Sequence, residues 1–166
     1  MAELTNDFTW SQSRDRVFQA CPRQYWFKCY GFWGGWERDA DERTRRIYVL
    51  TKLQTRQMWA GSVVHACIER TLKNLRRGID VLEPQKIIEV AIAGMREDFK
   101  WSRERRYWQK PKSCALFEHE YGVPVPDEQW RETAEGVKTC LHTFYTSELF
   151  ARLRAVPRVS PRLSGW

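Results

Sequence analysis

The sequence predicts a mainly α-helical fold, and three observations support this. Apolar residues recur every three or four positions along most of the chain, which is the spacing of one face of a helix. Serines and prolines stand where such helices would begin, and no stretch clearly alternates as a half-buried strand does. With 166 residues, 42% hydrophobic and 30% charged, the chain is long enough for a core and unlike a disordered tail. We therefore expect a single domain over 1–166.

Two short helices are expected at about 13–20 and 22–30. Ser11 and Ser13 are good N-caps, and the first helix is expected after Ser13. Pro22 suits the first turn of the second, because it has no N–H to donate. The stretch GFWGGW at 31–36 then predicts a glycine-punctuated turn that is rich in aromatic residues.

The middle of the chain predicts a third and a fourth helix. The third begins after Asp39 and carries apolar residues at helical spacing as far as Met58. Gly61 and Ser62 supply a break and a cap, after which the fourth helix runs to Gly78. Its apolar face is formed by Val64, Ile68, Leu72 and Leu75.

Two further helices are expected in the second half. Pro84 suits the first turn of a fifth helix, and the sixth runs over about 128–153. Between them, FEHEYGVPV is compatible with a short strand or a loop. The end of the chain, 156–166, has two prolines and no periodic pattern, so we expect an irregular tail there. The inward residues are Ile87, Ile88, Ala91, Met95 and Phe99 on the fifth helix, and Val137, Leu141, Phe144 and Tyr145 on the sixth.

The charge of the chain favours an anionic partner. The 28 Lys and Arg residues exceed the 21 Asp and Glu residues by seven, and a basic protein is drawn to phosphates by counterion release. DNA is therefore the leading partner class. The sequence has no apolar run of the ~18 residues that a membrane span needs, and no signal peptide, so we expect a cytoplasmic protein without a membrane partner.

The segment 14–28 interleaves cations and rings. Such a pattern could form a groove in which cations meet phosphates and rings stack on bases. At helical spacing, however, most of the rings are expected in the core, whereas the roles of the arginines stay open. The residues are Arg14, Arg16, Arg23, Tyr25, Trp26, Phe27 and Lys28.

His65 and Glu69 are the first candidates for chemistry. They stand four residues apart on a predicted helix, so both project from the same side. An imidazole and a carboxylate could together hold one edge of a divalent ion. The structural alternative is a partly buried histidine beside a solvent-facing glutamate.

Cys21 is the candidate iron–sulfur cluster ligand among the five cysteines. An iron–sulfur cluster needs four thiolates held together, whereas the cysteines are scattered along the chain without a CxxC pair. Reduced thiols therefore fit better than a disulfide framework, and a cluster within this chain is not expected. Cys21 can instead be a buried thiol at the start of the helix that Pro22 opens.

Two acidic patterns imitate a nuclease signature without its geometry. Pro126-Asp127 is followed by Glu135 and Lys138, but this spacing is ExxK on a predicted helix. A Glu-x-Lys pair needs a strand to place both side chains on one face. The same holds for Asp80, Glu83 and Lys86, so both patterns are set aside.

The pattern SxSRxxxFxxCPRxYWFxxYG, followed by GxxVHxxIE, resembles the N-terminal half of RecB-like nucleases of the PD-(D/E)XK superfamily. The two signatures in this order are more specific than either alone. The resemblance implies the helical N-terminal portion of a restriction-endonuclease-like α/β fold, with the core sheet largely missing from 1–166. The matching residues are Ser13, Arg14, Phe18, Cys21, Pro22 and Tyr25 in the first signature, and Gly61, His65 and Glu69 in the second.

The resemblance also implies a mechanism. In that family an Asp and a Glu-x-Lys on the sheet hold Mg²⁺ or Mn²⁺, and the metal activates water and neutralises charge on the scissile phosphate. His65 and Glu69 would be catalytic residues here, with His65 as a metal ligand. In the iron–sulfur branch Cys21 would be the first cluster ligand, but the three later cysteines are not found. We therefore expect a DNA nuclease of a repair, recombination or phage system that has little or no activity without a C-terminal half. The partners that the resemblance implies are this missing half or a helicase subunit.

A different class of function is compatible with the same residues. The chain could be a basic helical module that binds nucleic acid or a partner protein without catalysis. The DNA-binding residues expected under either hypothesis are Arg14, Arg23, Arg45 and Arg46.

Overall fold

The computed structural model describes residues 6–156 and is mainly helical, with no strand in that range. This confirms the predicted fold class at the level of secondary structure. Of the predicted tail 156–166, all but Val156 lies outside the described residues. The helices, in order, are α1 (Gln12–Ala20), α2 (Pro22–Cys29), α3 (Glu42–Lys52), α4 (Arg56–Arg76), α5 (Pro84–Arg103), α6 (Phe117–Glu120), α7 (Asp127–Thr146) and α8 (Glu148–Ala155), with a 3₁₀ turn η1 (Arg106–Trp108) after α5.

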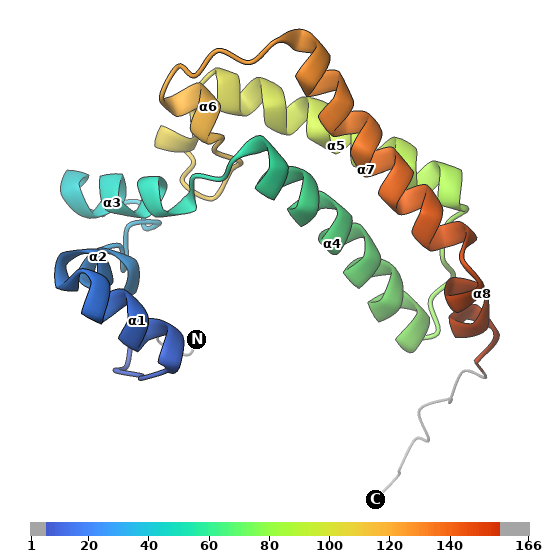
Figure 1. Cartoon of the computed structure of the whole chain (residues 1–166), viewed down its shortest axis with the longest axis horizontal. Helices are drawn as coiled ribbons and strands as arrows, with labels where there is room; N and C mark the ends of the chain where they lie inside the picture. Colours follow the sequence, from blue (N-terminus) through green and yellow to red (C-terminus); the bar gives the residue numbers. More distant parts are fainter. Residues whose placement is uncertain (1–5, 157–166) are drawn as a thin grey trace, which may run out of the picture.

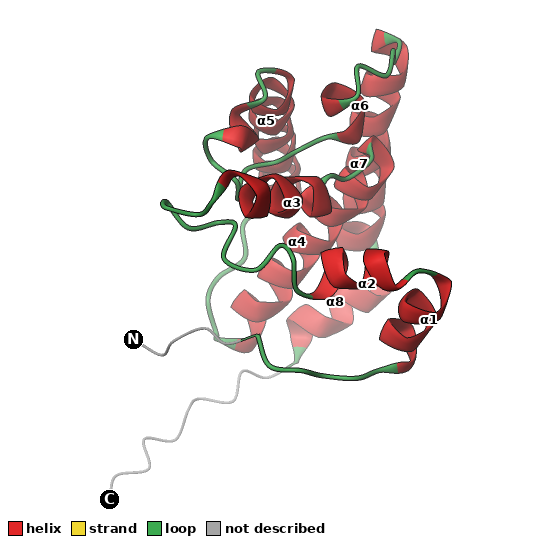
Figure 2. Ribbon diagram, turned by 90° about the vertical axis from the view of Figure 1, so that its left-hand side faces the viewer, coloured by secondary structure: helices red, strands yellow, loops and turns green. Residues whose placement is uncertain are grey.

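The helices form an arch with two unequal ends. Figure 1 shows the short helices α1, α2 and α3 at one end and the long helices α4, α5 and α7 at the other. In the second view the long helices again run alongside one another (Figure 2). Helix α7 contacts both α4 and α5, while α8 folds back against the end of α7. We call α1–α3, with the segment that precedes them, the N-terminal lobe, and α4, α5 and α7 the bundle.

The main hydrophobic core lies inside the bundle. Apolar side chains at helical spacing on α5 and α7 meet there, as the sequence predicts, and Leu141 is fully buried among them. Trp59 from α4 closes the core, and its indole N–H donates a hydrogen bond to Asp98 (3.3 Å). Each fully buried side chain of this size stabilises the fold by about 1.5–3 kcal/mol. The other fully packed members include Ile88, Ala91, Ile92, Met95, Leu116, Val137, Tyr145 and Phe150.

A second, smaller core joins the N-terminal lobe to the bundle. Tyr48 and Val49 of α3 pack against Tyr107 of η1 and against Ala115. The phenol of Tyr107 donates a hydrogen bond to Glu120 (2.6 Å), which anchors the turn after α5. The packing of α3 against η1 and Ala115 connects the two ends of the arch.

The boundary between the third and fourth helices differs from the prediction. Helix α3 ends at Lys52, and the hydroxyl of Thr55 caps α4 by accepting from the N–H of Met58 (3.3 Å). Between them Gln54 pairs in parallel with Leu116, so its backbone is extended rather than helical. The predicted break and cap at 61–62 are therefore wrong, because both residues lie inside α4.

The second half differs from the prediction at two places. The stretch expected as a short strand or loop contains helix α6, which begins just after the Leu116 bridge. The single helix expected over 128–153 is two helices, because Ser147 leaves helical geometry and caps α8 through the N–H of Phe150 (3.2 Å). Within residues 6–156, no helix combines the length and the apolarity needed to cross a bilayer.

Candidate nucleic-acid interface

The N-terminal lobe owes its short helices to side-chain caps. Ser11 caps α1 through the N–H of Arg14 (3.3 Å), and Asp41 caps α3 through the N–H of Thr44 (3.0 Å). The bonds from Thr44 lower the pKa of the Asp41 carboxyl, since they favour its charged form. These caps fix where each helix begins and therefore which side chains face outward.

Two of the four predicted DNA-binding arginines hold loops of the lobe. The guanidinium of Arg14 donates to the carbonyl of Thr9 (2.6 Å). The guanidinium of Arg45 donates to the carbonyls of Glu37 (2.6 Å) and Arg38 (2.9 Å). Both side chains are half-buried, so their first role in the isolated chain is to position the backbone.

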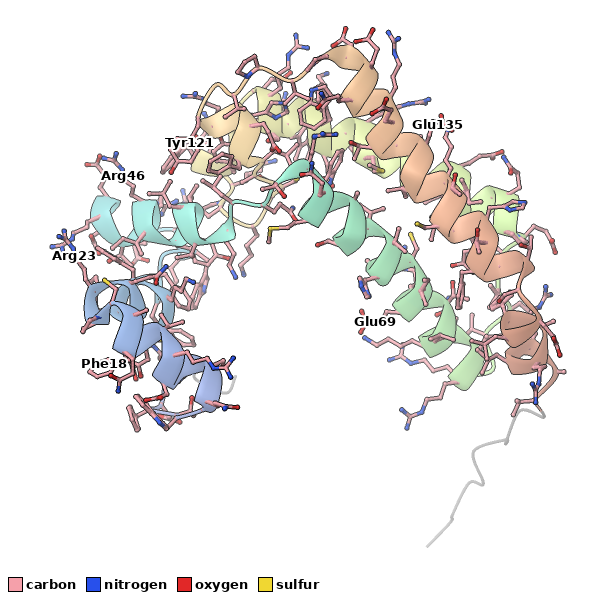
Figure 3. The ribbon with its side chains drawn as sticks, in the orientation of Figure 1. Phe18, Arg23, Arg46, Glu69, Tyr121 and Glu135 are labelled. Atoms are coloured by element: carbon pink, nitrogen blue, oxygen red, sulfur yellow. The ribbon has the colours of Figure 1, made fainter. Side chains whose placement is uncertain are left out.

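Arg23 and Arg46 are the more open pair. Both are exposed, and Figure 3 shows them pointing outward from α2 and α3, away from the inside of the arch. Arg23 lies over the ring of Phe27, with 5.8 Å between the guanidinium carbon and the ring centroid. Arg43 lies similarly over Trp26 (5.9 Å). Such contacts orient the cations and leave guanidinium N–H groups free for phosphate.

The prediction that most rings of segment 14–28 lie in the core is wrong, because only Tyr25 is buried. Tyr25 is buried, and the hydrogen bond that its phenol shares with the phenol of Tyr30 (3.2 Å), together with burial, raises its pKa to about 12. Phe27 is half-buried, whereas Trp26 is 43% exposed. Helices α1 and α2 pack on each other and on α3 but not on the bundle, so no layer of helices covers their outer faces.

His65 and Glu69 lie on α4, apart from the arginines. Both are exposed, so His65 is not the partly buried residue of the structural alternative. Figure 3 shows Glu69 pointing into the space enclosed by the arch, whereas Arg23 and Arg46 point out of it. The carboxylate of Glu69 pairs with the ammonium of Lys73 (2.6 Å), which lowers its pKa. His65 and Glu69 therefore lie close together on α4, apart from the outer face of the N-terminal lobe that carries Arg23 and Arg46.

The described residues do not by themselves fit Mg²⁺ or Mn²⁺. These hard cations take about six mostly oxygen ligands, and no three His, Cys, Asp or Glu side chains gather anywhere in residues 6–156. Around His65 only the Glu69 carboxylate is within one helical turn, and Lys73 already occupies it. Any metal held here needs carboxylates from another segment or chain.

Cys21 is exposed and caps a helix, so the prediction of a buried thiol is wrong. Its sulfur accepts from the N–H of Gln24 (3.4 Å) at the first turn of α2, which confirms its place at the helix junction. All five cysteines are free thiols. Burial raises the pKa of Cys114 to about 12, so that thiol is protonated and unreactive at neutral pH.

Sequence reasoning missed the hydrogen-bonded pair of half-buried His119 and buried Ser102. His119 shares a hydrogen bond between Nδ1 and the Ser102 hydroxyl (2.9 Å), and the same hydroxyl accepts from the N–H of Leu116 (2.9 Å). Ser102 is fully buried, so this pair supports the corner between α5 and α6 rather than meeting a substrate. The two residues are 17 positions apart, and no local pattern could connect them.

Acidification is expected to destabilise this corner. Burial lowers the folded-state pKa of His119 below the ordinary histidine value of about 6.5; Arg103 lowers this pKa further, whereas Glu118 opposes the shift. The unfolded chain then binds more protons, so the stabilisation is full above pH 6.5 and is lost as pH falls toward the folded-state pKa. Urea unfolding at about pH 7.5 and about pH 5.5 should show a lower free energy of unfolding in acid.

The contribution of His119 can be separated from that of other groups. His119→Asn should weaken the pH dependence, whereas His142→Asn, at an exposed position, should leave it unchanged. Equal pH dependence in all three proteins would contradict the assignment.

No family model, curated protein or solved structure matches this chain. Its function is therefore inferred from its residues and their geometry.

Proposed function

We propose that the chain is the helical, DNA-holding part of a RecB-like metal-dependent nuclease. The observation that carries this proposal is the placement of His65 and Glu69. They lie exposed, one turn apart, on a 21-residue helix at the inside of the arch, and the hydrophobic core uses neither of them. A metal-ligating histidine needs such a position, because carboxylates from elsewhere must be able to reach it.

The residues of the chain then divide into two tasks. Arg23 and Arg46 hold phosphates of DNA through their open guanidinium groups, supported by the net charge of +7. His65 binds the metal ion only together with an Asp and a Glu-x-Lys, and residues 6–156 do not supply these ligands. In this proposal the chain binds DNA but does not cleave it alone.

The source DNA beyond codon 166 tests the nuclease proposal directly. All three frames and the adjacent genes should be searched for an Asp on a strand-like segment followed by Glu-x-Lys on the next strand. Finding this pattern supports the proposal, since the carboxylates that His65 lacks would then exist. Its absence from every frame and neighbour would overturn the nuclease assignment.

A basic module that binds without catalysis is the second candidate. The observation that favours it is that Arg23 and Arg46 point outward from the N-terminal lobe, whereas Glu69 points into the space enclosed by the arch. A nuclease must bring the scissile phosphate to its metal, whereas a binding module needs only the outer face. Failure to find the carboxylates, together with DNA binding by this chain, would select this candidate.

A further inference from the structure

The segment before α1 and the first helix present three large aromatic rings to solvent. Phe8 is 70% exposed, Trp10 51% and Phe18 39%. Rings of this size are usually among the more buried parts of a protein, so a contiguous exposed group of them points to a binding surface. We call Phe8, Trp10 and Phe18 the ring row.

The ring row is supported from behind. Trp10 lies 6.1 Å from Phe8 at an interplanar angle of 23° and 6.0 Å from Phe18. Buried Tyr25 contacts Trp10 (5.9 Å) and Phe18 (5.4 Å) between ring centroids. Tyr25 therefore supports Trp10 and Phe18, and Phe8 stacks on Trp10, while a large part of each ring in the row remains open.

The segment that carries Phe8 and Trp10 is tied down at both ends. The amide of Asn6 donates to the carbonyl of Cys29 at the end of α2 (3.0 Å). At the other end, Arg14 donates to the carbonyl of Thr9 (2.6 Å). Exposed rings that are held in place lose little conformational entropy when a ligand stacks on them.

Cations lie beside the ring row. Arg14 is four residues before Phe18 and so shares its face of α1. Figure 3 shows Phe18 and Arg23 pointing to the same outer side of the lobe. Rings flanked by guanidinium groups are what a nucleic-acid strand needs, because each nucleotide brings one base and one phosphate.

We propose that the ring row binds single-stranded nucleic acid by base stacking, with Arg23 meeting its phosphates. This inference rests on the proposed function and deepens it by naming the form of nucleic acid. In a duplex the faces of the bases are already stacked on one another, so exposed rings gain nothing there. An apolar protein surface would cover the rings but would leave the guanidinium groups without anions.

The test compares binding of a fluorescein-labelled oligothymidylate of about 15 nucleotides with binding of a duplex of the same length. Trp10→Ala/Phe18→Ala should weaken single-strand binding about tenfold or more, because each stacked base is worth about 1–3 kcal/mol, and should leave duplex binding unchanged. Far-UV circular dichroism confirms that the variant is folded. Trp10→Tyr/Phe18→Tyr keeps the rings and should restore single-strand binding.

Two controls separate stacking from charge and from general apolarity. Phe117→Ala/Tyr121→Ala removes another exposed ring pair, on and just after α6 (4.6 Å between centroids), and should leave single-strand binding unchanged. An abasic strand keeps the phosphates and removes the bases, so the unchanged protein should bind it about tenfold or more weakly than oligothymidylate. This second comparison does not depend on any variant folding.

The outcomes distinguish this inference from the function it rests on. Equal binding of abasic and base-bearing strands would overturn the proposal that the ring row stacks on bases. Unchanged single-strand binding by the folded Trp10→Ala/Phe18→Ala protein would overturn it too. Neither result would contradict DNA binding by the chain. Failure of the unchanged protein to bind either single strand or duplex would overturn the DNA-holding proposal itself.

Discussion

Leu141→Ala is expected to lower the free energy of unfolding by about 2–5 kcal/mol. Leu141 lies on α7 with its side chain fully buried in the bundle core. Truncation removes one methine and two methyl groups and leaves a cavity that α4 and α5 can close only in part. For a chain of this length, such a loss is a large share of the total stability.

Urea denaturation followed by circular dichroism measures this change. Leu149→Ala on α8 is the matched control, because the same side chain is 60% exposed there and should change stability by less than about 0.5 kcal/mol. Equal effects at the two positions would show that α7 does not pack in the bundle as described.

Gly35→Ala is expected to destabilise the protein by about 1–3 kcal/mol, whereas Gly61→Ala should stabilise it by about 1 kcal/mol. A Cβ on Gly35 would lie 2.5 Å from Cβ of Tyr48 and 2.6 Å from the carbonyl of Thr44, and neither atom can move without shifting α3. A Cβ on Gly61 meets nothing within 4 Å, and this residue sits inside α4, where glycine costs backbone entropy.

The same chemical change therefore has opposite signs at two sites. Thermal unfolding of both variants beside the unchanged protein gives the two signs directly. A stabilised Gly35→Ala protein would mean that the 31–41 loop does not approach α3 closely. A destabilised Gly61→Ala protein would mean that position 61 is not an open helical position.

Periodicity predicted the bundle well, because α5 and α7 each bury one face in a shared core. Ile88 and Leu141 came from this reasoning, and both are buried. The break before α4 could not be predicted in the same way. It depends on Gln54 pairing with Leu116, more than sixty residues away, and on a cap at Thr55 that the apolar pattern runs across.

The candidate interface was predictable only in part. The sequence indicates the cations of the N-terminal lobe, and the structure divides them into loop-holding Arg14 and Arg45 and open Arg23 and Arg46. Exposure of the rings was missed, because helical spacing indicates which residues share a face but not whether another layer covers it. In the N-terminal lobe no further helix lies outside Phe18.

We propose that the outer face of the N-terminal lobe holds DNA, and the salt dependence of binding to a labelled duplex is the sharpest test of this proposal. Arg23→Ala/Arg46→Ala should weaken binding and reduce the slope of log K against log salt by about two, one for each lost phosphate contact.

The control is Arg152→Ala/Arg154→Ala, which removes the same charge from exposed positions on α8 at the other end of the arch. We expect the Arg152→Ala/Arg154→Ala protein to keep nearly the full slope of log K against log salt. Equal slopes for the two double variants would contradict the proposal, because DNA would then respond to net charge and not to this face.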